Sequence, residues 1–333
     1  MNRYLNILCA AFLGGVFLGL GFISAARAET ATLRYGQIAN SARSVSSLAL
    51  YIAQRKGFLT REGIDLKVTK LPGLHTMVEA VDKNDVDLSH TATPFLLQAV
   101  LKGSDALAVV GGPANTVHSL IAKPGIKTFA DLKGKVIGLS TPQDTLSIAM
   151  RLLLAKHGLN ERDYQVQEMQ GTPIRLECMV KGACSAAPLT QPLDLVSVQK
   201  GFRKLGDSLE VIPVLQFNVI AARRAWAETH KDTVVRFARA FADAYRFMRD
   251  PAHREEVAQI MVETIDISAP ISRQMLALYF EPDRGVMPKQ AEISFPGVAK
   301  VIELLGGVGE LKAPLPPAER FIDLQYLKAA GAQ

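Results

Sequence analysis

The stretch that decides the fold is LALYIAQRKGFLTREGIDLKV, residues 48–68. Its first part belongs to a segment with apolar residues at helical spacing, Ser44–Lys56, and the glycine that follows is a common helix terminator. Its last part, Asp65–Lys70, alternates apolar and polar residues as a β-strand does. Upstream lie the expected strand Thr32–Gly36 and the polar loop Gln37–Arg43. This order of strand, loop, helix and strand predicts a sheet with crossover helices.

The same alternation continues in two series of elements, separated by the break Gly111–Pro113, and the chain is helical in pattern from Trp226 to Leu305. Two similar series predict an α/β fold with two lobes. The other expected strands are Val86–His90, Ala106–Val110, Ser119–Ala122, Lys135–Leu139, Tyr164–Met169, Ser185–Ala187 and Leu209–Leu215. The other expected helices in these series are Leu74–Asp82, Phe95–Lys102, Pro142–His157, Pro173–Lys181 and Leu193–Lys200.

Composition narrows the function classes. The chain has 333 residues, 48% hydrophobic and 21% charged, which is typical of a globular protein and excludes a fibrous or disordered one. The net charge of +6 is not gathered in a basic block, so no nucleic-acid partner is expected, and only a weak bias toward small anions remains. Without a P-loop or GxGxxG motif, no cofactor is expected.

The first 28 residues have the features of a secretory signal peptide. Arg3 gives a positive start, Tyr4–Ile23 is apolar apart from one asparagine, and Ala26–Ala28 forms a small-x-small cleavage site. We expect cleavage after Ala28. An uncleaved membrane anchor is the alternative, because about 20 apolar residues can span a bilayer.

Two cysteines, Cys178 and Cys184, lie beyond this segment. In an oxidising compartment they can form a disulfide if the helix that carries the first ends near Lys181–Gly182 and the chain doubles back. Two buried free thiols are the alternative. Two cysteines without a nearby histidine supply too few ligands for zinc, so no metal site is expected here.

Three threonine–proline pairs follow expected strands: Thr93-Pro94, Thr141-Pro142 and Thr172-Pro173. Each predicts a helix with the threonine as N-cap and the proline as first residue, and Asp144 would complete a capping box with Thr141. Helix N-termini that follow strands gather at the carboxyl edge of an open α/β sheet, where ligands bind. We therefore expect a polar cradle for an anionic or hydroxylated ligand at that edge.

Ser140, within GLSTPQD (residues 138–144), raises the question of a serine nucleophile. A nucleophile elbow needs a small residue two positions after the serine, and Pro142 occupies that position, so an elbow is disfavoured. Arg43 and Arg175 could supply positive charge near the cradle; solvated surface arginines are the alternative.

The histidines do not predict a metal site. His75, His90 and His118 lie on separate elements without an i, i+4 pair or an HExxH motif, so hydrogen-bonding roles are expected. His90 ends a strand just before Thr91 and Thr93 and is a candidate ligand-binding residue.

Four segments resemble the periplasmic solute-binding proteins of nitrate, sulfonate and taurine ABC importers, in the thiamine-pyrimidine-precursor-binding-like superfamily. They are Leu48–Val68, Asn84–Gly103 (NDVDLSHTATPFLLQAVLKG), Phe129–Ser140 (FADLKGKVIGLS) and Pro188–Asp207 (PLTQPLDLVSVQKGFRKLGD). The resemblance implies a two-lobed type II periplasmic binding protein fold, each lobe a mixed sheet flanked by helices, with the ligand cleft between the lobes. After the expected signal peptide at 1–28, it implies lobe 1 at 29–113, lobe 2 at 114–217, and a return to lobe 1 with C-terminal helices at 218–333. The segment Lys181–Ala186 departs from the family pattern, which usually has an acidic residue there.

Carried over by position, the resemblance also implies ligand contacts from four places in the chain. These are the loop after the first strand, the end of the third strand, the start of the lobe-two helix and the loop before Pro192. The residues are Gln37, Ser41, Arg43 and Ser44; Thr91 and Thr93; Ser140 and Thr141; and Thr190 and Gln191.

The function that the resemblance implies is non-catalytic. A monomeric protein would capture a small organic anion of the sulfonate, taurine, nitrate or carboxylate type in the periplasm and deliver it to an inner-membrane permease. Its lobes would close by changes near Gly111–Ala114 and Leu215–Val219. The alternatives are binding of a thiamine pyrimidine precursor or an aromatic acid, an enzyme of the same fold, and a sensor subunit.

Overall fold

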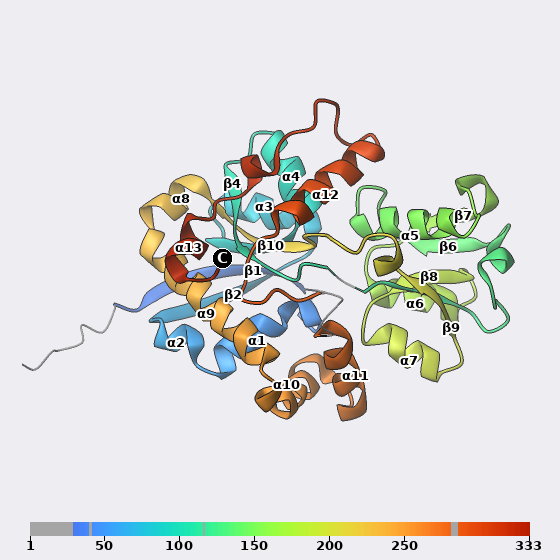
Figure 1. Cartoon of the computed structure of the whole chain (residues 1–333), viewed down its shortest axis with the longest axis horizontal. Helices are drawn as coiled ribbons and strands as arrows, with labels where there is room; N and C mark the ends of the chain where they lie inside the picture. Colours follow the sequence, from blue (N-terminus) through green and yellow to red (C-terminus); the bar gives the residue numbers. More distant parts are fainter. Residues whose placement is uncertain (1–28, 40–41, 116, 281–285) are drawn as a thin grey trace, which may run out of the picture.

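The computed structural model describes residues 29–39, 42–115, 117–280 and 286–333, so the expected signal peptide lies outside the described residues. The chain forms two lobes, each built on a five-stranded sheet with helices packed around it (Figure 1). The strand orders are β2-β1-β3-β10-β4 and β7-β6-β8-β5-β9. The prediction of a two-lobed α/β fold with mixed sheets is confirmed.

The elements have the following bounds. The strands are β1 (Ala31–Ile38), β2 (Ile64–Leu71), β3 (Leu88–Ala92), β4 (Ala106–Gly111), β5 (Ser119–Ala122), β6 (Val136–Leu139), β7 (Gln165–Glu168), β8 (Ala186–Leu189), β9 (Arg203–Asp207) and β10 (Asn218–Arg223). The helices are α1 (Leu48–Arg55), α2 (Phe58–Arg61), α3 (Leu74–Asp82), α4 (Thr93–Leu101), α5 (Thr145–Lys156), α6 (Thr172–Val180), α7 (Leu193–Gln199), α8 (Arg224–Thr229), α9 (Lys231–Arg249), α10 (Arg254–Met261), α11 (Ala269–Tyr279), α12 (Phe295–Gly307) and α13 (Gln325–Ala330).

The two sheets have the same topology. In the first, β1 runs parallel to β2 and β3, and β10 runs antiparallel to β3 and β4. In the second, β6 runs parallel to β7 and β8, and β5 runs antiparallel to β8 and β9. Because β10 returns to the first sheet after the second is complete, the chain crosses between the lobes twice, after β4 and after β9.

Apolar packing explains why the longest helix lies on the first sheet. The ring of Tyr35, on β1, lies 5.9 Å from that of Phe237 and 6.4 Å from that of Phe241, both on α9. All three side chains are buried. Their spacing of four residues on α9 places the two phenylalanines on one face, so the amphipathic sequence of α9 determines which side covers the sheet.

A disulfide joins Cys178, near the end of α6, to Cys184, just before β8, with Cα atoms 5.3 Å apart. The helix ends at Val180, and Gly182 has a φ of +81°, which lets the chain reverse direction as the sequence required for pairing. The bonded pair lies in a small apolar cluster with Ile121, Met179, Ala187 and Leu189. The disulfide therefore fastens α6 to the strand beside it.

The start of α5 differs from the prediction. The helix begins at Thr145, and Asp144 is its N-cap, with Oδ1 accepting the N–H of Leu146 at 3.0 Å. Thr141 instead opens a turn, because its carbonyl accepts the N–H of Asp144 at 3.1 Å. Proline is favoured at the second position of such a turn, which is where Pro142 stands, so the expected capping box of Thr141 and Asp144 is wrong.

The other two threonine–proline pairs begin helices one residue earlier than expected. Thr93 and Thr172 are the first helical residues of α4 and α6, and the N-caps are Ala92 and Gly171, neither with a side-chain cap. The prediction that these threonines are N-caps is therefore wrong. Proline is accommodated in the first turn at either position, because the N–H groups of that turn have no intrahelical partner.

The strand expected at Leu209–Leu215 is also wrong. The last strand of the second sheet is β9, and the carboxylate of Asp207 ends it by accepting the N–H of Leu209 at 3.1 Å, which starts a 3-10 turn at Ser208–Glu210. Pro213 lacks the N–H that a strand interior needs. The strand β10, which follows, was not expected from the sequence.

The second crossing is held by the first lobe. A Cβ on Gly297, in α12, would lie 2.5 Å from the carbonyl carbon of Leu215, so only glycine allows this approach. Next to it the buried side chain of Gln216 accepts the N–H of Ser294 at 2.8 Å and donates to the carbonyl of Asn218 at 2.8 Å. The segment before β10 is thus anchored to lobe 1.

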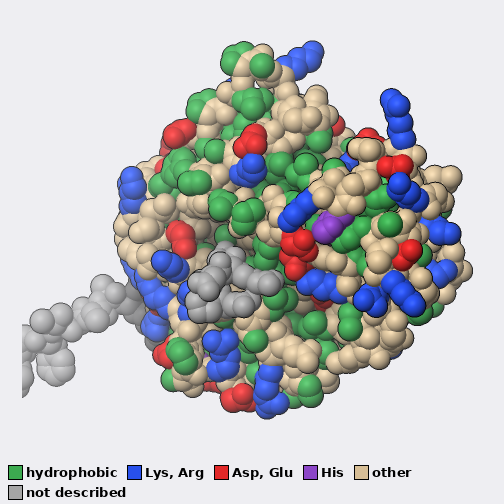
Figure 2. Space-filling view, turned by 45° about the vertical axis from the view of Figure 1, so that its right-hand side comes forward, with side chains coloured by type: hydrophobic (Ala, Val, Ile, Leu, Met, Phe, Trp, Pro, Cys, Tyr) green, Lys and Arg blue, Asp and Glu red, His purple; other side chains and the backbone are tan. Residues whose placement is uncertain are grey.

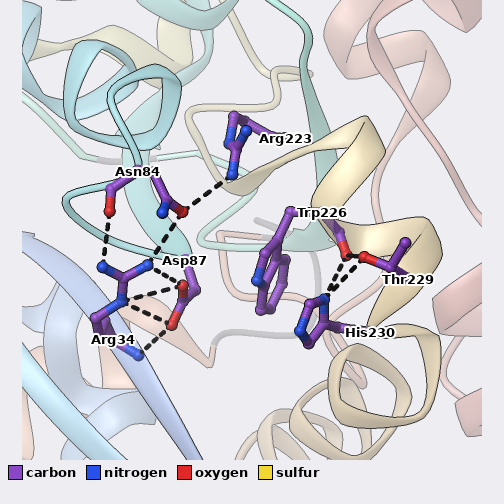
Figure 3. Close-up of polar contacts among 7 residues, drawn as sticks. All are labelled: Arg34, Asn84, Asp87, Arg223, Trp226, Thr229 and His230. Atoms are coloured by element: carbon purple, nitrogen blue, oxygen red, sulfur yellow. Dashed lines mark hydrogen bonds and ion pairs between the residues drawn. The ribbon is translucent and has the colours of Figure 1, made fainter.

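Polar contacts also stabilise the edge of the first sheet where β3 begins (Figure 3). The Arg34 guanidinium donates to both carboxylate oxygens of Asp87 and to the backbone and side chain of Asn84, and Arg223 reaches the same asparagine. The indole of Trp226 stacks on the nearby ring of His230. Because the Arg34 charge is paired with the Asp87 carboxylate, this cluster serves the structure of this edge.

Candidate functional site

The topology brings two sheet edges together. The strands β1 to β4 all end at one edge of the first sheet, and β6 to β9 all end at one edge of the second. Both crossings connect these two edges, from the end of β4 to the start of β5 and from the end of β9 to the start of β10. We call the region between them the junction.

Two contacts join the lobes at the junction. The hydroxyl of Tyr279, the last residue of α11, donates to Oε1 of Gln191 in the second lobe at 2.7 Å, and Figure 1 shows α11 beside that lobe. Phe217, in the second crossing, accepts the N–H of Thr93 at 3.0 Å, and its ring lies 5.7 Å from that of His118. Phe217 therefore lies between the end of the third strand and the second lobe.

A buried cation lies on the lobe-two side. The guanidinium of Arg175, on α6, donates to the carbonyls of Pro188 and Met169 at 2.8 and 3.1 Å and to the hydroxyl of Thr172 at 3.1 Å. The side chain of this arginine is 3% exposed, and no carboxylate pairs with it in the described part of the chain. The hydroxyl of Thr172 also lies 3.1 Å from that of Thr190, which follows β8.

Arg175 stays protonated although it is buried away from water. Burial lowers the pKa of Arg175 to about 10, and the charge of Asp144 opposes that shift. Burial, with a further contribution from the Arg175 charge, lowers the pKa of His118 to about 3. At neutral pH the arginine is therefore charged and the histidine neutral.

The carboxylate nearest Gln191 is fully engaged. Asp194 Oδ2 accepts from the Ser119 hydroxyl and from Nε2 of Gln191, each at 2.7 Å, and Oδ1 accepts the N–H of Leu195 at 2.7 Å. Burial raises the pKa of Asp194, while these hydrogen bonds oppose that shift. Because Nε2 of Gln191 donates to Asp194, the Oε1 atom of Gln191 is directed to Tyr279. Asp194 and Tyr279 together fix the orientation of the Gln191 amide.

The lobe-one side is a group of neutral side chains at the end of β3. His90, Thr91 and Thr93 are at most 5% exposed, and His90 Nε2 and both threonine hydroxyls have no hydrogen-bond partner among the described residues. Burial lowers the pKa of His90 to about 4, so its imidazole is neutral at pH 7. Buried polar groups without partners are uncommon in proteins and are typical of positions that a ligand or water satisfies.

The structure places most of the sequence-predicted site residues around the junction and the others away from it or outside the described residues. Around the junction it collects the side chains at the ends of β1, β3, β6 and β8, namely Gln37, His90, Thr91, Thr93, Ser140, Thr141, Thr190 and Gln191. Gln37 is buried and donates to the Ser47 hydroxyl at 2.7 Å. Arg43 is largely exposed and forms an ion pair with Asp266, Ser44 precedes the turn at Val45, and Ser41 lies outside the described residues.

Two residues of the junction were not selected from the sequence, and a third was undervalued. His118 and Tyr279 carried no pattern, because each reaches the junction through the packing of distant segments. Arg175 was recognised as a cation but not as a buried one. Its place in the first turn of a helix that follows a strand indicated that it lies near the cradle, and no signal in the sequence distinguished burial from exposure.

Removal of the Tyr279 hydroxyl tests the contact between the lobes. Tyr279→Phe should weaken solute binding about 3- to 10-fold, because one hydrogen bond that spans the junction is lost from a buried site. Isothermal titration of the purified protein measures the dissociation constant. Tyr326→Phe is the matched control, since its buried hydroxyl on α13 has no partner among the described residues. Equal affinities for Tyr279→Phe and wild type would contradict this role.

Neither a membrane-spanning helix nor a metal-binding group of side chains is found among the described residues. None of the helices in the described ranges has the length and apolar character needed to cross a bilayer. Within the same ranges no three or more His, Cys, Asp or Glu side chains are grouped to hold a metal ion.

Comparisons with solved structures show the fold. The ligand-binding component of an ABC-type import system from Staphylococcus aureus superposes with a TM-score of 0.75 at 15% identity, covering 91% of this chain and 99% of that one. The alkanesulfonate-binding protein SsuA from Xanthomonas axonopodis pv. citri, bound to MOPS, gives a TM-score of 0.67 at 21% identity, covering 88% and 98%.

Comparisons of sequence identify the family. The bicarbonate transport ATP-binding protein CmpC of Synechocystis sp. is 22% identical over 65% of this chain, and the match spans 36% of CmpC, so this chain corresponds to about a third of that protein. The family model described as "NMT1/THI5 like" matches residues 44–253, which include most of both lobes. The chain therefore belongs to the NMT1/THI5-like family.

Proposed function

We propose that this protein is the substrate-binding component of an ABC importer that captures a small organic anion in the periplasm and delivers it to an inner-membrane permease. Support comes from similar proteins described as a ligand-binding component of an import system, an alkanesulfonate-binding protein and a bicarbonate transport ATP-binding protein. A periplasmic aliphatic sulphonate-binding protein from Escherichia coli shares the fold as well.

The observation that carries this proposal is the buried Arg175 at the junction. A guanidinium that donates only to carbonyls and a hydroxyl retains its full positive charge in a low-dielectric setting, which a carboxylate or sulfonate would neutralise through charge-assisted hydrogen bonds. On the face shown in Figure 2, Lys and Arg side chains are instead spread over the surface with Asp and Glu among them. The buried arginine thus provides a localised anion site that this surface does not.

The remaining parts of the proposal concern organisation. The protein binds without chemistry, acts as a monomer, and divides into lobe 1 at 29–113, lobe 2 at 114–217 and a return to lobe 1 at 218–333. The solute contacts Arg175 on one side of the junction and the end of β3 on the other. Gln37, Ser140, Thr141, Thr190 and Gln191 complete its surroundings.

Thermal unfolding of the exported protein tests the proposal. A panel of sulfonates, nitrate, aliphatic and aromatic carboxylates and hydroxymethylpyrimidine is added one compound at a time. A true anionic solute at 100 times its dissociation constant should stabilise the folded state by about 2.7 kcal/mol and raise the melting temperature. The proposal fails if no anion raises it, if only the pyrimidine does, or if the bound compound is recovered chemically changed.

A further inference from the structure

The side chains at the end of β3 indicate which chemical group the solute carries at the end away from Arg175. The hydroxyls of Thr91 and Thr93 and Nε2 of His90 are each buried and have no partner within the described ranges. Successive residues on a strand point to opposite faces, so Thr91 and His90 lie on opposite faces of the sheet, and Thr93 continues into α4. Hydroxyls both donate and accept, and a neutral imidazole offers one of each.

This neutral group lies close to the cation. Thr93 donates its N–H to the carbonyl of Phe217, whose ring lies 5.7 Å from that of His118. His118 precedes Ser119, which pairs with Leu189, and the next residue, Thr190, lies 3.1 Å from the Thr172 hydroxyl that accepts from Arg175. These contacts connect the end of β3 to the guanidinium through neighbouring residues.

The carboxylates described near the cation are engaged elsewhere. Asp194 accepts three hydrogen bonds from protein groups, and Asp144 accepts the N–H of Leu146, the second residue of α5. Placing an ammonium group opposite Arg175 would add a second buried cation without a free counter-ion, which costs the desolvation energy of that ion. An uncharged hydroxyl there would instead meet groups that lack partners.

We infer that the solute is a monoanion whose other end is uncharged and hydrogen-bonding, such as a hydroxy sulfonate or hydroxy carboxylate, with Arg175 holding the anionic group and the hydroxyls of Thr91 and Thr93 holding the neutral end. Solutes that carry an ammonium group at that end are rejected. This inference rests on the proposed function and narrows its substrate class.

A series of matched probes tests the inference. 2-Hydroxyethanesulfonate, ethanesulfonate and 2-aminoethanesulfonate share one skeleton and differ only in a terminal hydroxyl, hydrogen or ammonium. A parallel series uses 3-hydroxypropanoate, propanoate and 3-aminopropanoate. In at least one series the hydroxyl form should bind about 10-fold tighter than the unsubstituted form, because it satisfies buried groups. The ammonium form should bind roughly 100-fold more weakly than the hydroxyl form.

Variants at the strand end show where the preference arises. Thr93→Val should remove the advantage of the hydroxyl form over the unsubstituted anion, and Thr93→Ser should retain that advantage. Ser89→Ala is the matched control, because the Ser89 hydroxyl is likewise buried without a partner among the described residues but lies earlier on β3.

The outcomes separate this inference from the proposed function. If anions bind but the ammonium form of either series binds as well as its hydroxyl form, or if other anions bind and neither series does, the inference is wrong and the proposed function stands. If Thr93→Val preserves the hydroxyl preference, the placement at β3 is wrong. If no anion binds in any experiment, both fall.

Discussion

Arg175→Met should weaken binding of the anionic solute by about 100-fold or more. The substitution keeps an unbranched apolar stem but removes the charge that would pair with the solute, and losing one partner of a buried charge pair costs about 2–5 kcal/mol, where each 1.4 kcal/mol is tenfold in affinity. Arg175→Lys should give an intermediate loss, because it restores the charge without the planar fork. Isothermal titration of the wild type and both variants measures the effect.

Folding must be controlled in this comparison, because the same guanidinium bonds the carbonyls of Pro188 and Met169. Far-ultraviolet circular dichroism and the melting temperature of each variant without solute provide that control. Arg162→Met is the matched substitution at an exposed arginine of the same lobe and should leave affinity within about twofold, since isolated surface charges contribute little. If Arg43→Ala abolishes binding and Arg175→Met does not, the anionic group lies at the first loop.

Loss of the disulfide should lower the free energy of unfolding by about 2 kcal/mol. The bond closes a short loop, with a sequence separation of 6, and the chain-entropy relation gives about this value for a loop of that length. Urea denaturation of wild type and of the double variant Cys178→Ser, Cys184→Ser measures the difference. Reduction of the wild type should produce the same loss and should leave the double variant unchanged. Coincident unfolding curves for the oxidised wild type and the variant would show that the bond contributes nothing.

Much of the architecture could be predicted because local sequence carries it. The helix Leu74–Asp82 and the strand Ser119–Ala122 have the predicted bounds, since their apolar spacing and flanking residues specify both type and ends. The helix start near Thr141 was misplaced for a local reason as well. Two capping residues compete there, and the turn that contains Pro142 gives the position to Asp144.

The candidate site could be predicted only in part. The sequence indicated that polar side chains follow β3, β6 and β8, because strand ends and helix starts are visible in its pattern. It did not indicate that His118 or Tyr279 contributes, because one lies in the first crossing and the other at the end of a helix far along the chain. Nor could it separate exposed Arg43 from buried Arg175.

The sequence by itself determined the alternating strands and helices, the two lobes and the polar residues at strand ends, because these depend on periodicity and on neighbours in the chain. Only the tertiary structure decided which cation is buried, which hydroxyls have no partner, and that Gln191 of one lobe meets Tyr279 of the other. Burial and hydrogen-bond partners depend on segments that are distant in sequence and become neighbours only when the two sheet edges come together.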